Sequence, residues 1–496
     1  MVEPLLLHID GKDVPAHDGK TFPVENPYTQ ERLFTAAHAT PIDVDSAVGA
    51  ATRAFGERRW WGIPARERAR VLARAAAALR AEIDDLARLE TSQTGRPLRE
   101  MRAQLGRLPE WFEYFGAIAQ TLEGSIPDVG EAKINLVRRR PLGVAALITP
   151  WNHPLLITMK KLSVALAAGN SVVVKPSELA PAAPLRLAGL LEAAGVPAGV
   201  VNVVSGLGAT TGKALVEHKG IHRLDVTGGT ETGRALAAAA GRNLIPVTAE
   251  LGGKAPVLVL QDADIDRAVA GALFASFIAT GQTCVQGAKV LVHRSIADEF
   301  KARFVARASK LTLGDPVDSS TQVGPLISEA QRERVADAVD RARGQGASVL
   351  CGGRVPAELP RGWFYEPTII DGVTSAMDIW REEVFGPVAV FDTFDDDADA
   401  IDKANDSPFG LAASIWTGDA SRALRMVDSL DIGIVWINDH HRIDPASPWG
   451  GSKDSGIGTE NSRDAFHGYT RPQSVLVNIS NERFDWYGTT AELRYS

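Results

Sequence analysis

A repeated alternation of strands and helices is the feature that most constrains the fold of this chain. Five short apolar runs, four of them rich in valine or leucine, are separated by helical segments of about the length that a crossover needs. The runs lie at 144–149, 171–174, 200–204, 223–226 and 245–249, and the helices at 154–168, 181–194, 209–217 and 231–240. Strands joined in this way are typical of βαβ units and predict a buried parallel sheet.

A second alternation begins at Ala255 and predicts a second α/β unit. Its expected strands are 257–260, 289–293, 348–350, 388–394, 412–416 and 432–437. The fold class predicted is therefore α/β, with two doubly wound parallel-sheet domains. The segment from Glu250 to Lys254 joins them, so we expect a ligand cleft at that hinge. Before residue 144, helices are expected at 43–55, 65–94 and 98–122, and we interpret their charged residues as solvent-facing.

Composition excludes several classes of protein. The net charge of −8 over 496 residues argues against binding of nucleic acid by bulk electrostatics. No apolar run approaches the ~18 residues of a membrane span, and the N-terminus lacks the pattern of a signal peptide. The two cysteines fit no zinc spacing and indicate a reducing compartment, so we expect a cytoplasmic protein without a metal site.

Polar residues gather where the first strands end, which is where open parallel sheets bind ligands. Asn152 follows the first strand, and its amide is suited to stabilise an oxyanion, although a turn residue is the alternative. Lys175 and Glu178 follow the second strand and suit a ribose, although a surface ion pair would look the same. The turn from Gly228 to Gly233 opens a helix after the fourth strand, where it would either approach a phosphate or form a tight turn.

Cys284 lies beside Gly281 at the junction between a helix and a strand. A thiolate there, with Glu250 as a nearby carboxylate base, would do covalent chemistry on a carbonyl group. The alternative for a lone cysteine is a buried, inert thiol. Glu383 and Phe385 precede a later strand and suit a second ribose and a nicotinamide ring, although the alternative is the start of a strand with a core phenylalanine.

Taken together, these stretches resemble the aldehyde dehydrogenase superfamily, in its hydrolytic, NAD(P)+-dependent branch. The matching motifs occur in the family's order over about 310 residues, and Glu250 and Cys284 keep the family's separation. They are Thr149–Asn152, 174–178, 227–233, Glu250–Lys254, 281–284, 382–387, 407–411 and 448–458. The resemblance is expected to extend from residue 1 to about 480.

The resemblance implies a role for each matching position. Cys284 would form the thiohemiacetal, Asn152 would hold its oxyanion, Glu250 would activate water, and Lys161 and Glu460 would connect that base to solvent. The site should also lower the pKa of the Cys284 thiol, which is about 8.5 in a free cysteine. The implied cofactor is NAD, with NADP possible, because relatives with the same Lys-Pro-Ser-Glu stretch accept either. Its expected contacts are Thr149, Pro150, Trp151, Lys175, Ser177, Glu178, Gly208, Thr227, Gly228, Gly229, Gly233, Leu251, Gly252, Glu383 and Phe385.

The resemblance also implies three parts and a homodimer or homotetramer. We expect a nucleotide-binding domain at 1–123 and 143–252 and a catalytic domain at 253–455. The segments 124–142 and 456–496 would form a bridging oligomerisation sheet and tail. Arg138, Arg139 and Arg140 would then lie on an interface strand rather than in an anion site. The tail after residue 480 is longer than usual and is predicted to reach a neighbouring subunit.

Departures from the family bear on the substrate. Lys289 replaces a common arginine, with an effect expected only on local packing, while His153 and Lys160 stand where aromatic residues are common. With the basic and histidine-rich loop 438–444, they predict a cationic channel and a carboxylate-bearing semialdehyde, although nearby aromatics keep an aromatic aldehyde open. The expected channel residues are His153, Lys160, Thr283, Val285, Ile443 and Trp449. A CoA-acylating relative and a non-catalytic binding protein remain the alternative functions.

Overall fold

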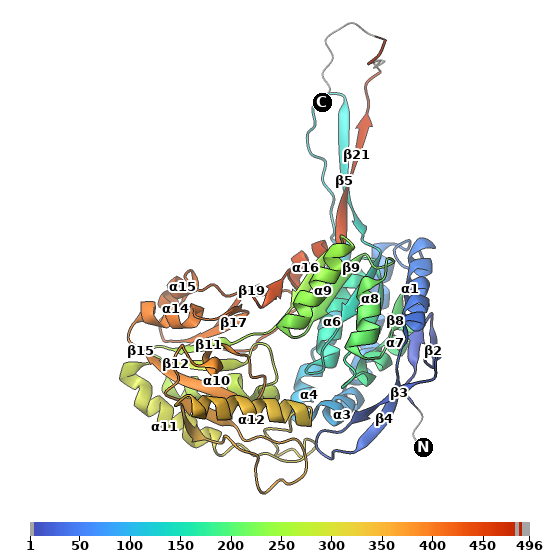
Figure 1. Ribbon diagram of the computed structural model, residues 1–496. Helices are drawn as coiled ribbons and strands as arrows, with labels where there is room; N and C mark the ends of the chain where they lie inside the picture. The colour runs from blue at the N-terminus through green and yellow to red at the C-terminus, as the bar shows by residue number, and fades with distance from the viewer. Residues whose placement is uncertain (1–3, 482–485, 489–496) are drawn as a thin grey trace.

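The computed structural model describes residues 4–481 and 486–488 and contains two large sheets side by side, with a thin arm projecting from one of them (Figure 1). The predicted fold class is confirmed: both sheets are mainly parallel and covered by helices. The tail predicted to reach a neighbour lies mostly outside the described residues.

The first sheet has eight strands in the order β2-β1-β8-β7-β6-β9-β10-β20. Its strands are β1 (Leu7–Ile9), β2 (Lys12–Val14), β6 (Val144–Ile148), β7 (Ser171–Lys175), β8 (Val201–Val203), β9 (Arg223–Thr227), β10 (Val247–Glu250) and β20 (Gly456–Ile457). The five central strands are parallel, and the chain runs outward from β6 in both directions. The order therefore reverses between β6 and β9, where doubly wound sheets bind ligands beyond the carboxyl ends of the strands.

The second sheet has seven strands in the order β13-β14-β15-β12-β11-β17-β18. They are β11 (Ala255–Val259), β12 (Gly287–His293), β13 (Ser348–Cys351), β14 (Thr368–Asp371), β15 (Val388–Phe394), β17 (Ala412–Trp416) and β18 (Ile434–Ile437). All neighbouring pairs are parallel except β13 with β14. Their interiors are buried valine, leucine, isoleucine and alanine, as a sheet covered on both faces requires.

Helices cover both sheets. Around the first lie α1 (Pro41–Gly56), α2 (Ala65–Ala81), α3 (Ile83–Thr94), α4 (Leu98–Leu105), α5 (Pro109–Gln120), α6 (Pro154–Ala167), α7 (Ala182–Ala193), α8 (Lys213–Glu217), α9 (Thr230–Arg242) and α16 (Ser462–Gly468). Around the second lie α10 (Ile265–Phe277), α11 (Ala297–Ala308), α12 (Glu329–Gly344), α13 (Asp378–Arg381), α14 (Asp397–Asn405) and α15 (Ala420–Val427).

The prediction of one continuous helix at 65–94 and another at 98–122 is wrong, because the structure has two helices in each range. The second breaks before Pro109, whose ring and missing N–H suit the first turn of a helix and not its interior. The first breaks at Glu82, which no glycine or proline marks. Leu79 and Leu86 on the two sides of that break are both fully buried, so the hydrophobic spacing continues across it and hides it.

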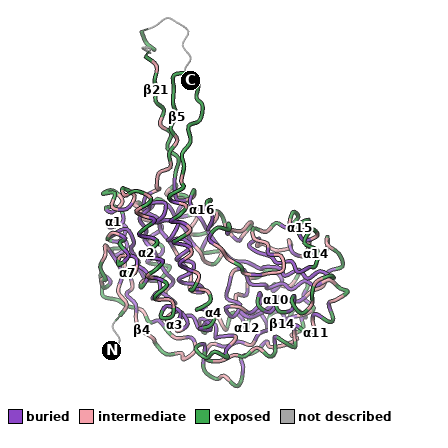
Figure 2. The backbone as a smooth tube through the Cα atoms, turned by 180° about the vertical axis from the view of Figure 1, so that it is seen from behind, coloured by how far each residue is buried: buried purple, intermediate pink, exposed green. Residues whose placement is uncertain are grey.

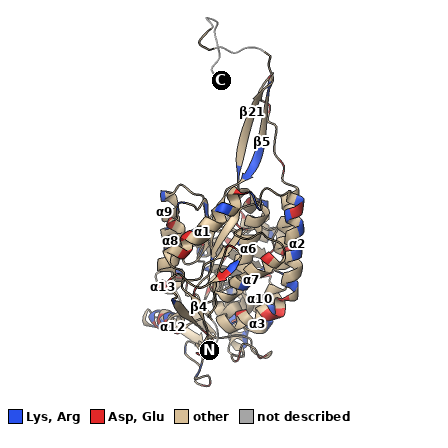
Figure 3. Ribbon diagram, turned by 90° about the vertical axis from the view of Figure 1, so that its right-hand side faces the viewer, with Lys and Arg blue, Asp and Glu red and all other residues tan. Residues whose placement is uncertain are grey.

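The arm is a two-stranded antiparallel ribbon of β5 (Lys133–Pro141) and β21 (Thr470–Asn478). Most of it is exposed, unlike the body of the molecule (Figure 2). Basic residues colour its base, where Arg139 donates to Thr470 and the Arg140 guanidinium lies 4.7 Å from the Trp61 ring (Figure 3). These arginines therefore contact the protein itself.

Shorter elements complete the fold. They are β3 (Thr21–Glu25), β4 (Arg32–Ala37), β16 (Phe409–Gly410), β19 (Ser452–Lys453), a π turn at Gly208–Gly212 and 3-10 turns at Ile278–Gly281 and Arg294–Ile296. Among the residues described, no helix combines the length and apolar character that crossing a bilayer requires.

Candidate functional site

A cavity of about 190 Å³ lies where the two sheets meet, at the switch point of the first sheet. The residues that line it come from loops distant in sequence. They are Pro150, Trp151, Asn152, Thr227, Gly228, Gly229, Leu251, Gly252, Cys284, Gln331, Arg334, Glu383 and Phe385. The cavity thus unites the expected nucleophile with nine of the expected cofactor contacts.

The loop that carries Cys284 has an unusual backbone. Helix α10 ends at Phe277, and the next turn places Ala279, Thr280 and Gly281 at φ of +53°, +56° and +71°. Non-glycine residues in this left-handed region are strained, and such strain concentrates at functional sites. A Cβ on Gly281 would lie 2.1 Å from the Gly386 carbonyl oxygen, so only glycine lets this loop close onto its neighbour.

Asn152 lies in the loop after β6, with its side chain directed toward the cysteine loop. Its Nδ2 donates to the Gln282 carbonyl at 2.9 Å, which fixes the amide two residues before Cys284. The amide has a second N–H, which remains to serve a ligand. Its Oδ1 is buried and has no hydrogen-bond partner among the residues described.

Glu250 is the last residue of β10 and is 4% exposed. Neither of its carboxylate oxygens has a hydrogen-bond partner within the described part of the chain. Burial, with the negative charge of Glu460, raises the pKa of Glu250 well above its usual value. A buried carboxyl group with two free acceptor sites is suited to hold and deprotonate a water molecule.

Behind Glu250 lies a buried network of charges. Lys161 Nζ donates to Asp225 at 2.5 Å and to Glu460, while Lys160 Nζ lies 2.5 Å from the other Glu460 oxygen. Tyr469 donates to Asp225 at 2.5 Å. Burial opposes ionisation of Lys161, but Asp225 and Glu460 outweigh it and raise its pKa; the two lysines likewise lower the pKa of Glu460 despite its burial. Lys161 and Glu460 therefore stay ionised.

The expectation that the site lowers the pKa of Cys284 is wrong in this structure. Burial raises the pKa of the thiol to about 12, and Glu383, Glu250 and Glu460 add to the rise. Lys160 is the cation that opposes it. The resting cysteine is therefore a thiol, chiefly because it is buried.

The glycine turn after β9 is built to receive a ligand closely. Gly228 and Gly229 line the cavity, and a Cβ on either would meet no protein atom within 4 Å. Gly229 caps the N-terminus of α9, so that helix directs free N–H groups toward the cavity. Gly233 has a different role, because its Cβ would lie 2.2 Å from Leu251 Cδ2 and block the packing of helix on strand.

The other side of this cavity is formed by Glu383 and Phe385. Glu383 accepts from the Gly253 N–H at 2.9 Å, and burial raises its pKa to about 7. Phe385 lies edge-on to Trp151, with ring centroids 5.4 Å apart. Gln331 and Arg334 of α12 bind the backbone here, and sequence reasoning missed both because nothing in their helix distinguishes them.

The remaining predicted cofactor residues lie around this cavity rather than on its lining. Lys175 is buried and donates to Glu178 at 3.2 Å, so the expected pair forms at the end of β7. Thr149 and Ser177 are buried in the loops after β6 and β7, and Gly208 begins the π turn.

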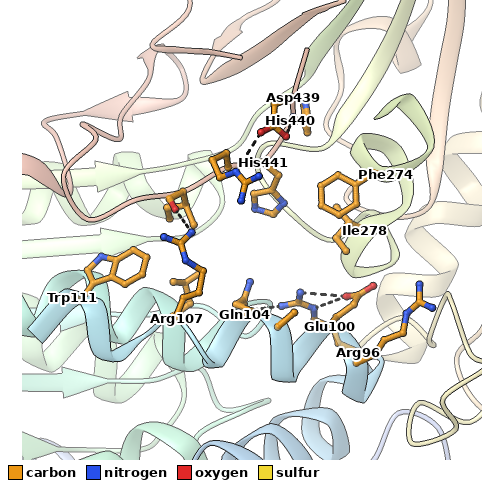
Figure 4. Close-up of a pocket in the computed structure, with 15 residues that line it drawn as sticks. Arg96, Glu100, Gln104, Arg107, Trp111, Phe274, Ile278, Asp439, His440 and His441 are labelled. Atoms are coloured by element: carbon orange, nitrogen blue, oxygen red, sulfur yellow. Dashed lines mark hydrogen bonds and ion pairs between the residues drawn. The ribbon is translucent and has the colours of Figure 1, made fainter. Parts of the chain in front are cut away.

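A second and larger cavity, of about 450 Å³, is lined in part by Arg96, whose guanidinium contacts the Asn152-His153 segment; its lining is drawn in Figure 4. Its charged lining consists of four arginines, Arg96, Arg99, Arg107 and Arg442, against Glu100 and Asp439. Gln104, Trp111, Leu156, Phe274, Ile278, His440, His441 and Ile443 supply much of the remainder. The cavity is therefore cationic and partly apolar.

The interpretation of the early helices as carriers of solvent-facing charges is wrong for this cavity. Arg96 is 3% exposed and donates to Glu100, Gln104 and His153. Glu90 is fully buried and accepts from the Leu155 N–H at 2.7 Å. A signal was present in the sequence, because Arg96 lies between a glycine and a proline that stop α3 and start α4.

Of the six expected channel residues, Ile443 lines this cavity and the other five are buried around it. His153 contacts Arg96 and Thr283, and Lys160 lies 4.4 Å from the Trp449 ring. The carbonyl oxygen of Val285 accepts from His440 Nε2 at 2.7 Å. Burial lowers the pKa of His440 to about 4 and that of His441 to about 3, so the histidines are neutral. The arginines carry the positive charge instead.

Two doubly wound sheets, with a glycine turn and a cysteine facing one cavity between them, define a dinucleotide-dependent oxidoreductase. The comparisons with known proteins specify it further. The profile of the Aldehyde dehydrogenase family matches residues 14–475. The chain belongs to the aldehyde dehydrogenase family and is an NAD(P)-dependent enzyme of that family.

Individual relatives match over nearly the full length. Betaine aldehyde dehydrogenase of Bacillus subtilis (strain 168) is 39% identical over 490 residues, which cover 97% of this chain and 99% of that protein. The crystal structure of a putative aldehyde dehydrogenase from Burkholderia cenocepacia has a TM-score of 0.95 at 43% identity, covering 97% and 99% of the two chains. Betaine aldehyde dehydrogenase of Staphylococcus aureus in complex with NAD+ has a TM-score of 0.96 at 36% identity, covering 98% and 97%.

Proposed function

We propose that this enzyme oxidises an aldehyde to a carboxylic acid with NAD+ through a covalent intermediate on Cys284, and that the aldehyde carries a carboxylate. The observation that carries the first part is that Cys284 and Asn152 line one cavity, while Glu250 directly precedes Leu251 and Gly252 of the same lining and its charge acts on the Cys284 thiol. The separate roles of these residues are our proposal.

In the first step, the Cys284 sulfur attacks the aldehyde carbon and its proton passes to solvent. The new S–C bond leaves the former carbonyl oxygen as an alkoxide. The free N–H of the Asn152 amide and the backbone N–H of Cys284 are the donors for that oxygen. Lys160 supports the thiolate, because it is the cation that favours ionisation of the thiol.

The residues around the glycine turn fit a dinucleotide. The N-terminus of α9 and Gly229 suit the pyrophosphate, Lys175 and Glu178 suit the adenosine ribose, and Glu383 suits the second ribose. NAD+, when bound, supplies the hydride acceptor that converts the thiohemiacetal into a thioester. The carboxylate of Glu178 disfavours a 2′-phosphate, so we propose NAD over NADP.

In the last step, Glu250 takes a proton from water, which attacks the thioester carbon and releases the acid and the Cys284 thiol. The overall balance consumes aldehyde, NAD+ and water and yields acid, NADH and a proton. Glu460, with Lys161 and Lys160, lies behind Glu250 and supports a path for that proton to leave.

The substrate class rests on the second cavity. Four arginines against two carboxylates favour an anion, and buried histidines that are neutral do not oppose it. The named relatives suggest another candidate, because betaine aldehyde carries a quaternary ammonium group. The arginine-rich lining makes a cation the less favourable of the two.

An aldehyde panel tests both parts. We expect NADH formation with NAD+ to be fastest for a carboxylate-bearing semialdehyde, slower for its neutral methyl ester and slowest for betaine aldehyde. Cys284→Ala is the control for every substrate. Preference for the ester or for betaine aldehyde would overturn the substrate class, and no turnover with any aldehyde would overturn the reaction. Adding CoA distinguishes the CoA-acylating alternative, which predicts an acyl-CoA product instead of the free acid.

We also propose that the arm pairs subunits into a homodimer or homotetramer. Its strands expose apolar side chains, among them Leu136 at 43% and Leu476 at 65%. A double change of Leu136→Asp and Leu476→Asp should reduce the mass measured by light scattering; an unchanged mass would refute the proposal. In the same way we propose the domain division at 1–123 with 143–252, 253–455, and 124–142 with 456–496, except that β20 and α16 of the last segment pack with the first domain. The two free cysteines support a cytoplasmic location.

A further inference from the structure

The Arg96 guanidinium is fixed by partners on several sides. Its Nε and Nη2 each lie 3.3 Å from Glu100 Oε2. Its Nη1 donates to Gln104 Oε1 at 3.1 Å and to the Asn152 carbonyl at 3.3 Å, and lies 2.7 Å from His153 Nδ1. With 3% exposure and this many partners, Arg96 has little freedom to turn away from His153.

These contacts determine where the proton of neutral His153 resides. A guanidinium has only donors, so the imidazole nitrogen that faces it at 2.7 Å must be an acceptor. Gln104 does not decide between the tautomers, because its Nε2 lies 3.0 Å and its Oε1 3.2 Å from the same Nδ1, so Arg96 is the contact that decides. The proton of the ring is therefore on Nε2.

The charged and titratable groups that face this ring keep it neutral. Burial, followed by Arg96, His441 and Lys160, holds the pKa of His153 well below 6.5. His441 is itself neutral and meets the ring edge-on, with centroids 5.8 Å apart. No carboxylate is among the causes that shift the pKa of His153, so none of them favours a second proton on the ring.

His153 Nε2 faces the residue that precedes Cys284. It lies 3.3 Å from Thr283 Oγ1, so the N–H donates to that hydroxyl oxygen. Thr283 is 1% exposed, and within the described residues its hydroxyl proton has no other acceptor. A hydroxyl group that accepts one hydrogen bond is a better donor of its own proton, because hydrogen bonds in a chain polarise one another.

We propose that Arg96 is a positioning residue that holds His153 as its Nε2–H tautomer, so that Thr283 presents a polarised O–H donor beside the proposed nucleophile. The donor selects substrates with an oxygen acceptor close to the aldehyde group. This inference rests on the proposed aldehyde oxidation for its kinetic consequence, but not for the tautomer.

The first test reads the tautomer directly in the full-length enzyme. Protein labelled with ¹⁵N-histidine has ten histidines, and the signals of His153 are those missing from His153→Phe. At neutral pH we expect a protonated Nε2 and an unprotonated Nδ1. A protonated Nδ1, or protonation of both nitrogens, would overturn the proposal whether or not the enzyme turns over any aldehyde.

The second test uses matched variants and leaves the buried Arg96–Glu100 pair intact. In His153→Gln the amide nitrogen can reach the place of Nε2, whereas in His153→Asn it can reach only the place of Nδ1. For an aldehyde with an adjacent oxygen acceptor we expect His153→Asn to raise KM at least about fivefold, as loss of one hydrogen bond predicts, and His153→Gln to raise it less than half as much. An aldehyde lacking that acceptor should not distinguish the two variants.

Equal effects of the two variants on both aldehydes, with normal turnover by the unmodified enzyme, would overturn the inference alone. Absence of turnover by the unmodified enzyme would overturn the proposed function, and the tautomer measurement would then decide the inference. Arg96→Lys completes the series, because it keeps a cationic donor at Nδ1 and should preserve the tautomer; conversion to Nδ1–H in that variant contradicts the role assigned to Arg96.

Discussion

The two cavities near Asn152 and the cysteine loop are formed by different kinds of structural element. The cofactor side consists mainly of loops at strand ends, with glycines, a helix N-terminus and Glu383, and with Gln331 and Arg334 of α12. The substrate side consists of side chains from α4, the end of α10 and the loop 439–443. The position of the cofactor cavity is therefore determined by the topology of the sheet. The lining of the substrate cavity is determined by the particular side chains that project from the helices and the loop.

That difference suggests how specificity can change in such an enzyme. Any change at the glycine turn affects a backbone that must approach a fixed ligand closely. Changes at Arg99 or Arg442 alter charge at a cavity wall without disturbing a strand. We therefore expect substitutions on the two sides to affect different kinetic constants, and the following experiments test that separation.

The largest effect is expected at the point that the two cavities share. Cys284→Ala should reduce turnover by roughly 10⁴-fold or more, as deletion of a nucleophile does in other enzymes. NAD+ binding, measured by protein fluorescence, should survive because the glycine turn is intact. The control is Cys351→Ala, at the end of β13 and outside both cavities. Turnover retained by Cys284→Ala would mean that no covalent intermediate is required.

Glu250→Gln is expected to slow steady-state turnover by about 10²–10⁴-fold, the usual contribution of a general base. Rapid mixing should still show one burst of NADH per active site, because only thioester hydrolysis is impaired. The base acts when ionised, and burial raises its pKa well above 4.5. Turnover of the unmodified enzyme should therefore fall as the pH drops through that raised pKa, above the ordinary carboxyl range. A missing burst would place Glu250 in the first step.

The sequence predicts the cofactor side of the molecule better than the substrate side. The strand alternation locates the switch points, so the sequence alone places Asn152, Gly228 and Glu250 at strand ends. It does not place Glu100, because a charged residue on a helix gives no sign of which face is buried until its neighbours are packed. Arg96, in the turn before that helix, is marked by its flanking glycine and proline, but its partners in space are not. His153 is visible in the sequence as a departure, but the arginine that determines its proton lies 57 residues earlier in the chain.

The pKa of Cys284 shows another limit of sequence reasoning. The family resemblance predicted an activated thiol, whereas burial and three carboxylates raise its pKa to about 12. The pKa of a thiol depends on how far the surrounding charges lie from it and on how deeply it is buried. Neither can be deduced from the spacing of motifs in the sequence. Lys160 was expected to give the channel its positive charge, yet its ammonium is paired with Glu460.

The pKa of the Cys284 thiol can be tested directly in the enzyme without ligands. Below a pKa of about 12 the thiolate fraction rises about tenfold per pH unit, so alkylation of Cys284 by iodoacetamide should accelerate about 100-fold over two units. Lys160→Met should slow it further, because Lys160 opposes the carboxylates. The rate of alkylation at Cys284 is the difference between the rate for the unmodified enzyme and the rate for Cys284→Ala. A plateau near neutral pH would show that the thiol is activated before any ligand binds.

Gly229→Val tests the cofactor side alone. A Cβ at this position meets no protein atom, so the fold should be kept while the side chain fills space in the cavity. Overpacking of this kind costs about 1–3 kcal/mol, so we expect KM for NAD+ to rise about tenfold with KM for the aldehyde little changed. Gly233→Ala is the contrasting variant: its Cβ would strike Leu251, so it should lower the melting temperature. Equal effects on both Michaelis constants would contradict the separation.

Arg99→Gln tests the substrate side and should have the smallest effect. Arg99 is exposed at the cavity, and no hydrogen bond or ion pair ties its guanidinium within the described part of the chain, unlike Arg96, Arg107 and Arg442. Exposed ion pairs contribute about 0.2–1 kcal/mol, which corresponds to a rise in KM of roughly 1.5- to 5-fold for a carboxylate-bearing aldehyde. The methyl ester of the same aldehyde should show no change, and neither should KM for NAD+. Because surface charge is screened, the effect should shrink as salt is added. A rise in KM that is equal for acid and ester would mean that Arg99 shapes the cavity rather than recognising charge, and the anion preference would then have to come from the paired arginines deeper in the wall.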